Sequence, residues 1–452
     1  MAQSEPIQIR SADQPKPRRI VFATIGSFGD LHPGLALALE LQRRGHMVTI
    51  ASTEFYRGKV ERQGVLFRPI RPNWNPTDQE LIRQCEDLRT GPEILFRKLI
   101  LPHLRDTYED LLSACSDADL MIAGELVYAA PLVSEKLGLR WVSAILSPSS
   151  FFSSHDPSVL VTVPSLMLLR RAGWRVYRAG LNVCRLATRH WSNPIRRLRR
   201  ELRLRPDCDP VFRDKFSPDL VLALFSHSLA RSQPDWPPQT IQPGFVYYDD
   251  DKLQGDSFTE LAQFLASGDP PIVFTLGSTA VHHPGDFYES SVAAARRLGR
   301  RAVLLGVSPQ SRFVAQDIFA LPYAPYSEVF PHAAVIVHQG GSGTTAQALR
   351  AGRPMLFVPY GWDQPDNAAR VERLGIGLSL PRTAYAADSA STALHRLLTE
   401  SDFAARAAEI SDRLRQEDAL GAACQVIESV LRRGSTSVDG CVGRRFLRTM
   451  RH

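Results

Sequence analysis

Short apolar runs alternate with helical patterns along the first part of the chain. An apolar run at 19–24 ends in Gly26-Ser-Phe-Gly-Asp30, and a helical pattern over 33–44 leads to a second apolar run at 46–51. Two further runs follow, at 119–124 and 140–145. Strands that alternate with helices in this order are typical of βαβ units. The first half of the chain therefore predicts a parallel sheet with helices on its faces.

The same order returns in the second half of the chain. Two of its apolar runs end in glycine-containing turns, Gly277-Ser278-Thr279 and Gln339-Gly-Gly-Ser-Gly343. The predicted strands lie at 271–276, 302–306, 334–338 and 355–359, and the predicted helices at 285–298 and 344–351. A second α/β unit is therefore expected, and it too has a glycine turn between strand and helix.

The length of 452 residues exceeds one ordinary core, which agrees with two domains. A proline cluster over 232–238 and the acidic Asp249-Asp-Asp251 mark the boundary between them. The predicted divisions are a flexible tail at 1–17, an N-terminal domain at 18–235, a linker at 236–256, a second domain at 257–401, a helix at 402–432 and a flexible tail at 433–452.

The positive charge of the chain is concentrated in residues 165–206, whose own excess of arginine is larger than the net charge of +7 of the whole chain. This segment holds twelve arginines against a single acid, Glu201, with apolar residues between them, and Pro194 is expected to divide it into two helices. Three interpretations stay open: a solvated helical face, a lid over an acceptor site that also rests on anionic lipid, and a nucleic-acid surface. No nucleic-acid motif accompanies the charge, so no nucleic-acid partner is predicted.

The sequence indicates neither a metal site nor a secreted protein. Its six cysteines are scattered and lack zinc-ligand spacing, and Asp207-Cys-Asp209 is expected to be a loop after the basic helices. The polar N-terminus has no signal-peptide pattern, and no apolar stretch reaches about 18 residues. A cytoplasmic protein is expected, with peripheral contact to the inner face of the membrane through 165–206.

The second glycine turn has the properties of a diphosphate site. Its glycines let the backbone approach a ligand closely, and a helix that begins near Ser342 presents unpaired N–H groups and a positive dipole end. Asp363 and Gln364 follow the next predicted strand, so they are expected beside that site. A carboxylate and an amide suit the hydroxyls of a sugar.

These motifs together resemble the GT-B nucleotide-sugar glycosyltransferases, over residues 19–430. The motifs that carry the resemblance are Gly26-Ser-Phe-Gly-Asp30-x-x-Pro33 with Arg44-Gly-His46, and the string from His338 through Gly352-x-Pro354 to Asp363-Gln-x-x-Asn367. The resemblance implies two Rossmann-like, doubly wound α/β domains that face each other across a cleft. The first would bind the acceptor and the second the donor, and the helix at 402–432 would return to the first domain.

Within that family the chain looks most like the sterol glucosyltransferases and the rhamnosyltransferase of rhamnolipid biosynthesis. Ser147-Pro-Ser149 with His155, Gln233-Pro-Asp-Trp-Pro237 and Phe274-Thr-Leu-Gly-Ser278 carry the second likeness.

The resemblance also implies roles for single residues. Asp30 would be the catalytic base, with His32 as the alternative base. Tyr323 would stack on the nucleobase, Gln347 would meet the ribose, and Asp363 with Gln364 would hold the transferred sugar. The full predicted donor set is Gly277, Ser278, Thr279, Tyr323, His338, Gln339, Gly341, Ser342, Gly343, Thr344, Gln347, Asp363 and Gln364.

Two departures from the family pattern bear on these roles. Many members have a histidine at the position of Gln339, where this chain has His338 one residue earlier. Plant members have an aspartate that orients a catalytic histidine, and here Ala123, Gly124 and then Glu125 occupy that region. An aspartate base needs no such partner. For Asp30, a simple helix cap is the competing interpretation.

The expected activity is inverting, metal-independent transfer of a hexose from a UDP- or dTDP-sugar to a hydroxyl of a small lipophilic acceptor. A lipid, sterol, terpenoid or polyketide would fit, and no cofactor is expected beyond the donor itself. Two alternatives remain: an epimerase of the nucleotide sugar, and a catalytically weak auxiliary protein at a lipid surface.

Overall fold

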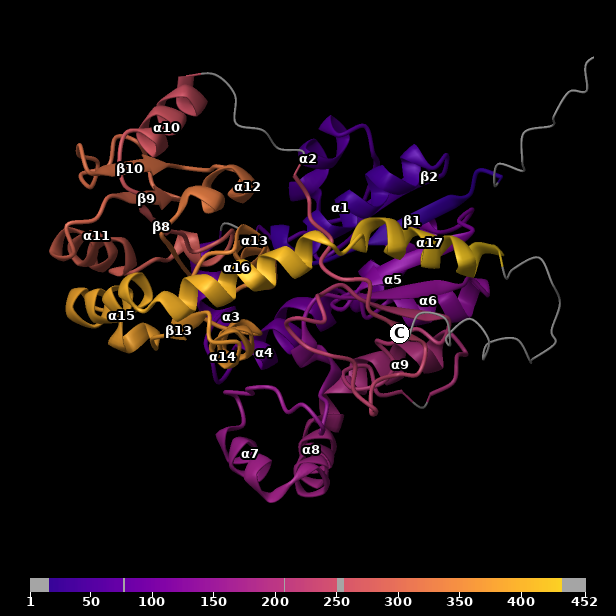
Figure 1. The fold of residues 1–452 in the computed structure, drawn as a ribbon. Helices are drawn as coiled ribbons and strands as arrows, with labels where there is room; N and C mark the ends of the chain where they lie inside the picture. The colour runs from indigo at the N-terminus through magenta and orange to yellow at the C-terminus, as the bar shows by residue number, and fades with distance from the viewer. Residues whose placement is uncertain (1–15, 76–77, 207, 250–255, 433–452) are drawn as a thin grey trace, which may run out of the picture.

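Two parallel sheets form the framework of the computed structural model, which describes residues 16–75, 78–206, 208–249 and 256–432 (Figure 1). The first sheet has the order β3-β2-β1-β4-β5-β6-β7. Its strands are β1 (Arg19–Ala23), β2 (Met47–Ser52), β3 (Leu66–Pro69), β4 (Leu120–Gly124), β5 (Trp141–Ile145), β6 (Leu220–Ala223) and β7 (Thr240–Ile241). Every pairing within it is parallel.

The second sheet has the order β10-β9-β8-β11-β12-β13, and its pairings are parallel too. Its strands are β8 (Ile272–Phe274), β9 (Ala302–Leu305), β10 (Ile318–Leu321), β11 (Val335–His338), β12 (Met355–Phe357) and β13 (Gly377–Ser379). In both sheets the strand order reverses beside the first strand, between β1 and β4 and between β8 and β11. Ligands of open α/β sheets bind at such reversal points.

Helices cover the faces of both sheets. Those of the first half are α1 (Phe28–Arg43), α2 (Arg57–Arg62), α3 (Gln79–Cys85), α4 (Gly91–Ile94), α5 (Leu104–Ala114), α6 (Ala130–Leu137), α7 (Pro164–Leu169), α8 (Trp174–Thr188) and α9 (Asn193–Glu201). Those of the second half are α10 (Asp256–Ala266), α11 (Phe287–Arg297), α12 (Tyr326–Val329), α13 (Ser342–Ala351), α14 (Gln364–Arg373), α15 (Ala387–Thr399), α16 (Ser401–Arg415) and α17 (Ala419–Arg432).

The strands are buried on both faces, as their continuous apolar sequences require. In β1, Ile20 and Phe22 pack in one core with α1, whereas Val21 and Ala23 point into a separate core on the opposite face. The alternation follows from the two-residue period of a strand. Each sheet thus has a hydrophobic layer on either side, which is the doubly wound arrangement that the sequence predicts.

The last described helix returns to the first domain. Helix α16 packs on α13, where the Ser411 hydroxyl donates to the carbonyl of Arg350 at 2.6 Å. Helix α17 then crosses to the first domain (Figure 1), and its Ile427 is fully buried in the same core as Leu31 of α1. The predicted helix at 402–432 is therefore wrong in one respect, because it is two helices separated at 416–418.

Three other predicted boundaries also need correction. Helix α1 begins at Phe28, ahead of the predicted start at 33, because Ser27 caps it and Pro33 is accommodated inside it. Strand β7 extends the first sheet past the predicted limit at 235 and into the predicted linker. The basic segment holds three helices, because the chain also breaks at Gly173, where φ is +95°.

None of the described helices is long and apolar enough to cross a membrane.

Candidate active site

The reversal points of the two sheets face each other across the domain boundary. Helix α1 follows β1, and helix α13 follows β11. Their first turns come so close that a Cβ added at Gly343 would lie 4.0 Å from Cα of Gly29. Two helix N-termini, each with a partial positive charge, therefore converge on one point between the domains. A ligand held there would touch both domains at once.

Asp30 lies in the first turn of α1 at this point. Its Oδ2 accepts hydrogen bonds from the backbone N–H of Ser27 at 2.7 Å and from the Ser27 hydroxyl at 3.2 Å. The Ser27 hydroxyl in turn accepts from the N–H of Gly29 at 3.1 Å, which completes a capping box. The cap uses one carboxylate oxygen only. Oδ1 makes no hydrogen bond to any described residue, so it remains available to a substrate proton.

The electrostatic surroundings of Asp30 favour a base that works near neutral pH. Removal from water raises the pKa of Asp30 to about 6, against the hydrogen bonds from Ser27, which lower it. The carboxylates of Asp363 and Glu125 lie close enough to raise this pKa further. A carboxylate with a pKa near 6 is mostly ionised at pH 7 yet more basic than an exposed aspartate.

Gly26 makes room for this carboxylate. Its φ is +144°, and a Cβ there would lie 2.2 Å from Oδ2 of Asp30. The hydroxyl of Tyr56 donates to the carbonyl of Gly26 at 2.9 Å and holds the turn from the other side. The glycine in the turn after β1 therefore leaves the space that the carboxylate of Asp30 occupies.

His32 and Glu125 are placed as neighbours of Asp30. The His32 ring stacks on Tyr248, with centroids 4.9 Å apart, and also lies against Phe28 at 5.3 Å. Glu125 follows β4, and its carboxylate accepts from Lys215 at 2.5 Å and from Ser150. No hydrogen bond joins Glu125 to Asp30, so Glu125 acts on the base through its charge.

The turns after β8 and β11 form one cradle. A Cβ at Gly277, where φ is +68°, would lie 2.1 Å from Nε2 of Gln339. Gln339 thus reaches across from one turn to the other, in the place where the family pattern has a histidine. Its Oε1 is buried and has no hydrogen-bond partner among the described residues.

His338 lies beneath this cradle and not at its surface. Its side chain is fully buried against Phe357, and burial lowers the pKa of His338 to about 3. Nδ1 accepts a hydrogen bond from the N–H of Gly340 at 3.1 Å. In this arrangement a neutral His338 shapes the turn, and a direct contact with a diphosphate would need the ring to move.

The start of α13 and the turn after β8 supply donors to the cradle. Gly341 is the N-cap residue of α13 and provides no side chain, so the first N–H groups of the helix, at Ser342, Gly343 and Thr344, have no cap. Ser278 and Thr279 are partly exposed, and their hydroxyls bond to no described residue. These groups are suited to phosphate oxygens.

Asp363 and Gln364 begin α14 beside the cradle. Oδ2 of Asp363 accepts from the Ser342 hydroxyl at 2.6 Å and from the Asn367 amide at 2.9 Å. Burial raises the pKa of Asp363, while the hydrogen bonds from Ser342 and Asn367 lower it. Oε1 of Gln364 accepts from the N–H groups of Tyr360 and Gly361 at 2.7 and 3.0 Å. Its amide nitrogen is left for a ligand.

Of the two predicted nucleoside contacts, Tyr323 follows the edge strand β10 and Gln347 lies on α13. Tyr323 is 53% exposed, and its contact with a nucleobase stays a prediction. Gln347 bonds to the carboxylate of Asp249 at 3.3 Å and accepts from Arg350 at 2.9 Å. Asp249 thus places a carboxylate next to Gln347, where many family members have a glutamate.

The sequence did not identify Ser27 and Asn367 as residues of this site. Ser27 holds Asp30 in place, and the spacing Ser-x-x-Asp is a recognisable capping-box signal. Asn367 stood in the motif without a role, and it joins Asp363 to the carbonyl of Gly340 at 2.9 Å. The described residues contain no group of three or more histidines, cysteines, aspartates or glutamates arranged for a metal ion. Asp207 lies outside the described residues, and its neighbour Asp209 pairs with Arg185.

Two family models match the chain, one in each half. The glycosyltransferase family 28 N-terminal domain matches residues 20–150. The C-terminal domain of the erythromycin biosynthesis protein CIII-like family matches residues 305–425. The two matches contain the turns that hold Asp30 and Asp363.

Relatives of known activity match almost the whole chain. O-mycaminosyltylonolide 6-deoxyallosyltransferase of Streptomyces fradiae is 32% identical over 436 residues, which cover 91% of this chain and 97% of the relative. A sterol 3-beta-glucosyltransferase of Arabidopsis thaliana is 26% identical over 427 residues, which cover 90% of this chain. The chain spans 64% of that plant relative and 26% of a UDP-sugar-dependent glycosyltransferase of Dictyostelium discoideum.

Solved structures show the same fold. The spinosyn forosaminyltransferase SpnP superposes with a TM-score of 0.68 at 19% identity, over 92% of this chain and 100% of that one. The glycosyltransferase VinC in complex with dTDP superposes with a TM-score of 0.65 at 20% identity, over the same shares. With two parallel sheets, facing glycine turns and these relatives, the chain belongs to the GT-B nucleotide-sugar glycosyltransferases and is a glycosyltransferase.

Proposed function

We propose that the chain transfers a sugar from a dTDP- or UDP-sugar to a hydroxyl of a lipophilic acceptor, with inversion at the anomeric carbon. The observation that carries the proposal is the position of Asp30, across the domain boundary from the uncapped start of α13. A base on one domain thereby faces a diphosphate cradle on the other. A single in-line displacement requires the base and the leaving group on opposite sides of the sugar.

The proposed reaction moves one proton and one glycosyl group. Oδ1 of Asp30 accepts the proton of the acceptor hydroxyl as its oxygen bonds to the anomeric carbon. The bond between that carbon and the diphosphate oxygen breaks, and the nucleoside diphosphate leaves. N–H groups at 342–344 and the hydroxyls of Ser278 and Thr279 stabilise its charge. Asp363 and Gln364 hold the sugar. These donors take the part of a metal ion, so transfer is proposed to need none.

The proposed acceptor is a macrolide-like polyketide or a sterol. The support is the pair of relatives, one named for a tylonolide derivative and one for a sterol. Three structural neighbours are complexes with thymidine diphosphate, which makes a dTDP-sugar the first donor to try.

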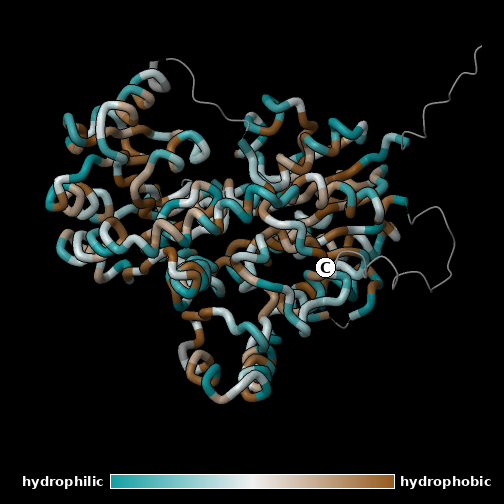
Figure 2. Tube along the Cα trace, viewed as in Figure 1, coloured by the Kyte–Doolittle hydropathy of each residue, from teal (hydrophilic) through white to brown (hydrophobic). Residues whose placement is uncertain are grey.

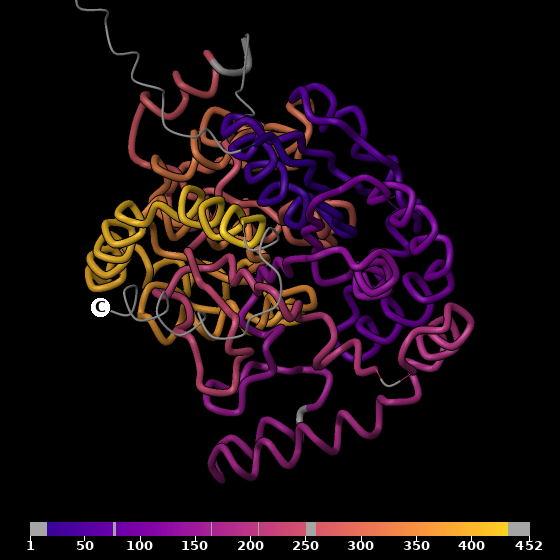
Figure 3. Tube along the Cα trace, turned by 90° about the vertical axis from the view of Figure 1, so that its right-hand side faces the viewer, coloured from indigo at the N-terminus to yellow at the C-terminus, as the bar shows by residue number. Residues whose placement is uncertain are grey.

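Peripheral membrane contact through helices α7 and α8 is the second part of the proposal. The hairpin projects from the two domains (Figures 1 and 3). Helix α8 buries Tyr177 and Leu181 against α7, and a separate stripe of Val176, Val183 and Leu186 stays 43%, 66% and 69% exposed. Figure 2 shows apolar and polar segments interleaved along this hairpin.

The charge of the hairpin favours an anionic lipid surface over a second copy of the chain. Arg170, Arg171, Arg175 and Arg178 form no ion pair with the described residues, and no acid lies between Asp156 and Glu201 in the sequence. A symmetric dimer through this face would set arginines against arginines. An apolar stripe flanked by arginines matches an interfacial helix. Helix α9 takes no part, because it is packed on the body through Ile195 and Leu198.

The test of the proposed reaction is product analysis with the purified protein. Donors would be dTDP- and UDP-hexoses, including a dTDP-deoxyhexose, and acceptors would be macrolactones, sterols and hydroxylated lipids, each with and without EDTA. The proposal predicts a glycoside whose anomeric configuration, read by NMR, is opposite to that of the donor, at a rate that EDTA leaves unchanged. Retention of configuration, or loss of transfer in EDTA, would contradict the mechanism.

A further inference from the structure

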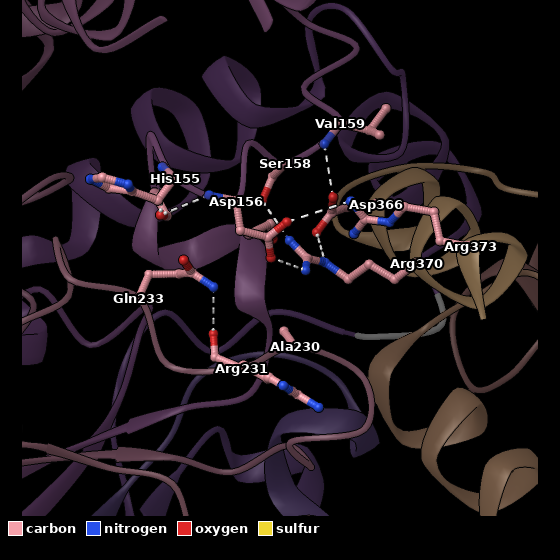
Figure 4. A network of polar contacts seen from close by, with 12 residues as sticks. His155, Asp156, Ser158, Val159, Ala230, Arg231, Gln233, Asp366, Arg370 and Arg373 are labelled. Atoms are coloured by element: carbon pink, nitrogen blue, oxygen red, sulfur yellow. Dashed lines mark hydrogen bonds and ion pairs between the residues drawn. The ribbon is translucent and has the colours of Figure 1, made fainter. Parts of the chain in front are cut away.

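A buried ion-pair cluster joins the donor domain to the acceptor domain beside the active site. Oδ1 of Asp366 on α14 accepts from the N–H of Val159, in the segment after β5, at 2.8 Å. Nε of Arg370 donates to Oδ2 of Asp366 at 2.7 Å, and its other nitrogens donate to Asp156 and to the Ser158 hydroxyl. Figure 4 shows these side chains converging from the two domains. The side chains of Asp366 and Arg370 are each 2% exposed.

The segment that α14 meets is itself fixed to the acceptor domain. Asp235 accepts from the Ser153 hydroxyl and from the N–H of Ser154, both at 2.7 Å. Phe151, at the start of this segment, stacks on Trp236 with centroids 4.1 Å apart. The cluster therefore ties α14 to a segment that the acceptor domain holds in place, so α14 follows the position of that domain.

The cluster lies one helical turn from the residues proposed to hold the sugar. Asp366 follows Asp363 by three residues, a distance of about 4.5 Å along a helix. Between the two, Asn367 donates to Asp363. Ahead of Asp363, the indole of Trp362 donates to the carbonyl of Cys85 in the acceptor domain at 2.5 Å, with Trp362 at φ +60°. The acceptor domain thus holds the start of α14 from two directions.

Burial makes this arrangement depend on contact between the domains. Charged groups are costly to bury unless every hydrogen-bonding atom is satisfied. Arg370 meets that condition only with Asp156 and Ser158, which the other domain supplies. Separation of the domains would leave Asp366 as its only partner and would release the N–H of Val159.

We propose that Asp156, Asp366 and Arg370 are positioning residues that fix Asp363 and Gln364 for sugar transfer when the two domains are closed. The inference rests on the proposed function, because it uses the sugar-holding role of Asp363 and Gln364. In this proposal the cluster affects the rate of sugar transfer and the closure of the two domains. Nucleotide affinity does not depend on it, because the proposed nucleotide contacts all belong to the second domain.

The test uses Asp156→Asn in the full chain, since Asp156 is 20% exposed on a loop and its replacement leaves the buried Asp366–Arg370 pair intact. We expect Kd for dTDP and UDP to stay within about twofold of wild type. We expect kcat for transfer to fall about tenfold or more, because small misplacements of reacting groups are costly. Asp156→Glu should recover most of the rate.

The matched control is Asp402→Asn, which removes an exposed aspartate that pairs with Arg406 within α16. It should change neither kcat nor Kd. A wild-type kcat in Asp156→Asn would overturn the proposal, as would joint loss of nucleotide binding and thermal stability, which would indicate a merely structural role.

Small-angle scattering separates this inference from the proposed function. With dTDP bound, the radius of gyration of Asp156→Asn should exceed that of the wild type, because closure is weakened. Equal radii would overturn the proposal whether or not an acceptor is known. If the wild type binds nucleotide, shows this difference, but transfers no sugar, the proposed function fails while the closure role of the cluster stands.

Discussion

At the scale of single residues, the proposed chemistry centres on one carboxylate, Asp30, to which we assign two roles. Oδ2 of Asp30 completes the capping box of α1 with Ser27, and Oδ1 stays available. The cap and the base, which are competing interpretations in the sequence, are therefore compatible. The cap fixes the rotamer of the carboxylate, and a fixed base needs no reorganisation when the substrate arrives.

The pKa of about 6 for Asp30 predicts the pH profile of transfer. The base must be ionised, so kcat/KM should rise with pH through about 6 and level off above about 7. Steady-state rates between pH 5 and 8 measure this directly. A rate that is constant across that range would contradict a base with this pKa.

The same shift predicts how Asp30→Asn changes stability. A raised pKa in the folded state favours folding below the unfolded value of about 4, and this contribution is lost as pH rises through 6. Above pH 6 the wild type keeps a charge that is costly to bury, and asparagine carries none. Thermal unfolding at pH 8 should give Asp30→Asn a Tm equal to or above that of wild type. A clearly lower Tm at pH 8 would mean that the cap outweighs the charge.

Gly26→Ala tests the room made for Asp30. A Cβ at Gly26 would displace the carboxylate, so kcat should fall about a hundredfold. Gly45→Ala is the matched control, because Gly45 also has a positive φ, of +92°, but nothing within 4 Å of the added Cβ. Both variants carry backbone strain of about 1–2 kcal/mol. Equal kcat in the two variants would show that strain, and not crowding of Asp30, decides the effect.

At the scale of elements, most strands follow from apolar runs in the sequence, but β3, β6, β7, β10 and β13 were not predicted, although the run that forms β6 is apolar throughout. The strands β1, β2, β4 and β11 were predicted from their apolar runs, and the glycine turn before α13 was predicted too. The three-residue β13 and the two-residue β7 have too little sequence for a pattern. The structure places the start of α1 at Phe28, ahead of the predicted 33, and the Ser27–Asp30 capping box is the sequence signal for that start.

The hairpin of α7 and α8 gives a prediction about lipid binding. Each arginine near an anionic surface contributes about 1 kcal/mol, so Arg175→Gln with Arg178→Gln should weaken binding to phosphatidylglycerol vesicles about thirtyfold. Vesicle sedimentation measures this, with phosphatidylcholine as the neutral comparison. Arg413→Gln with Arg415→Gln on α16 removes the same charge from helix-internal ion pairs and should have little effect. Equal losses of vesicle binding in the two double variants would mean that net charge alone decides binding. No loss in the variant with Arg175→Gln and Arg178→Gln would contradict membrane contact through this hairpin.

At the scale of the whole molecule, the two domains meet through contacts that no sequence pattern predicts. Arg370 and Asp156 are 214 residues apart, and neither lies in a sequence motif that would predict the pairing. The break at 416–418 has no such signal either, and it separates α16, which packs on α13, from α17, which packs in the core of the first domain. The motifs predicted which turns would hold the proposed site, whereas the packing of the domains decides how those turns meet.

The return of α17 to the first domain predicts a stability effect far from the site. Ile427→Ala leaves a cavity in the core shared with Leu31 and should lower the free energy of unfolding by about 2–5 kcal/mol. Val314→Ala, at a 42% exposed position, should stay within about 0.5 kcal/mol of wild type. Denaturant unfolding compares the two. Similar small losses would mean that α17 packs loosely on the first domain.

One comparison of kcat decides whether Asp30 is the base of glycosyl transfer. Asp30→Asn keeps the shape of the side chain, and Asp78→Asn alters another aspartate that caps a helix, α3, outside the site. We predict that Asp30→Asn lowers kcat about a thousandfold with nucleotide Kd unchanged, while Asp78→Asn transfers like wild type. Transfer by Asp30→Asn at the wild-type rate would contradict the claim and leave Asp30 as a cap alone.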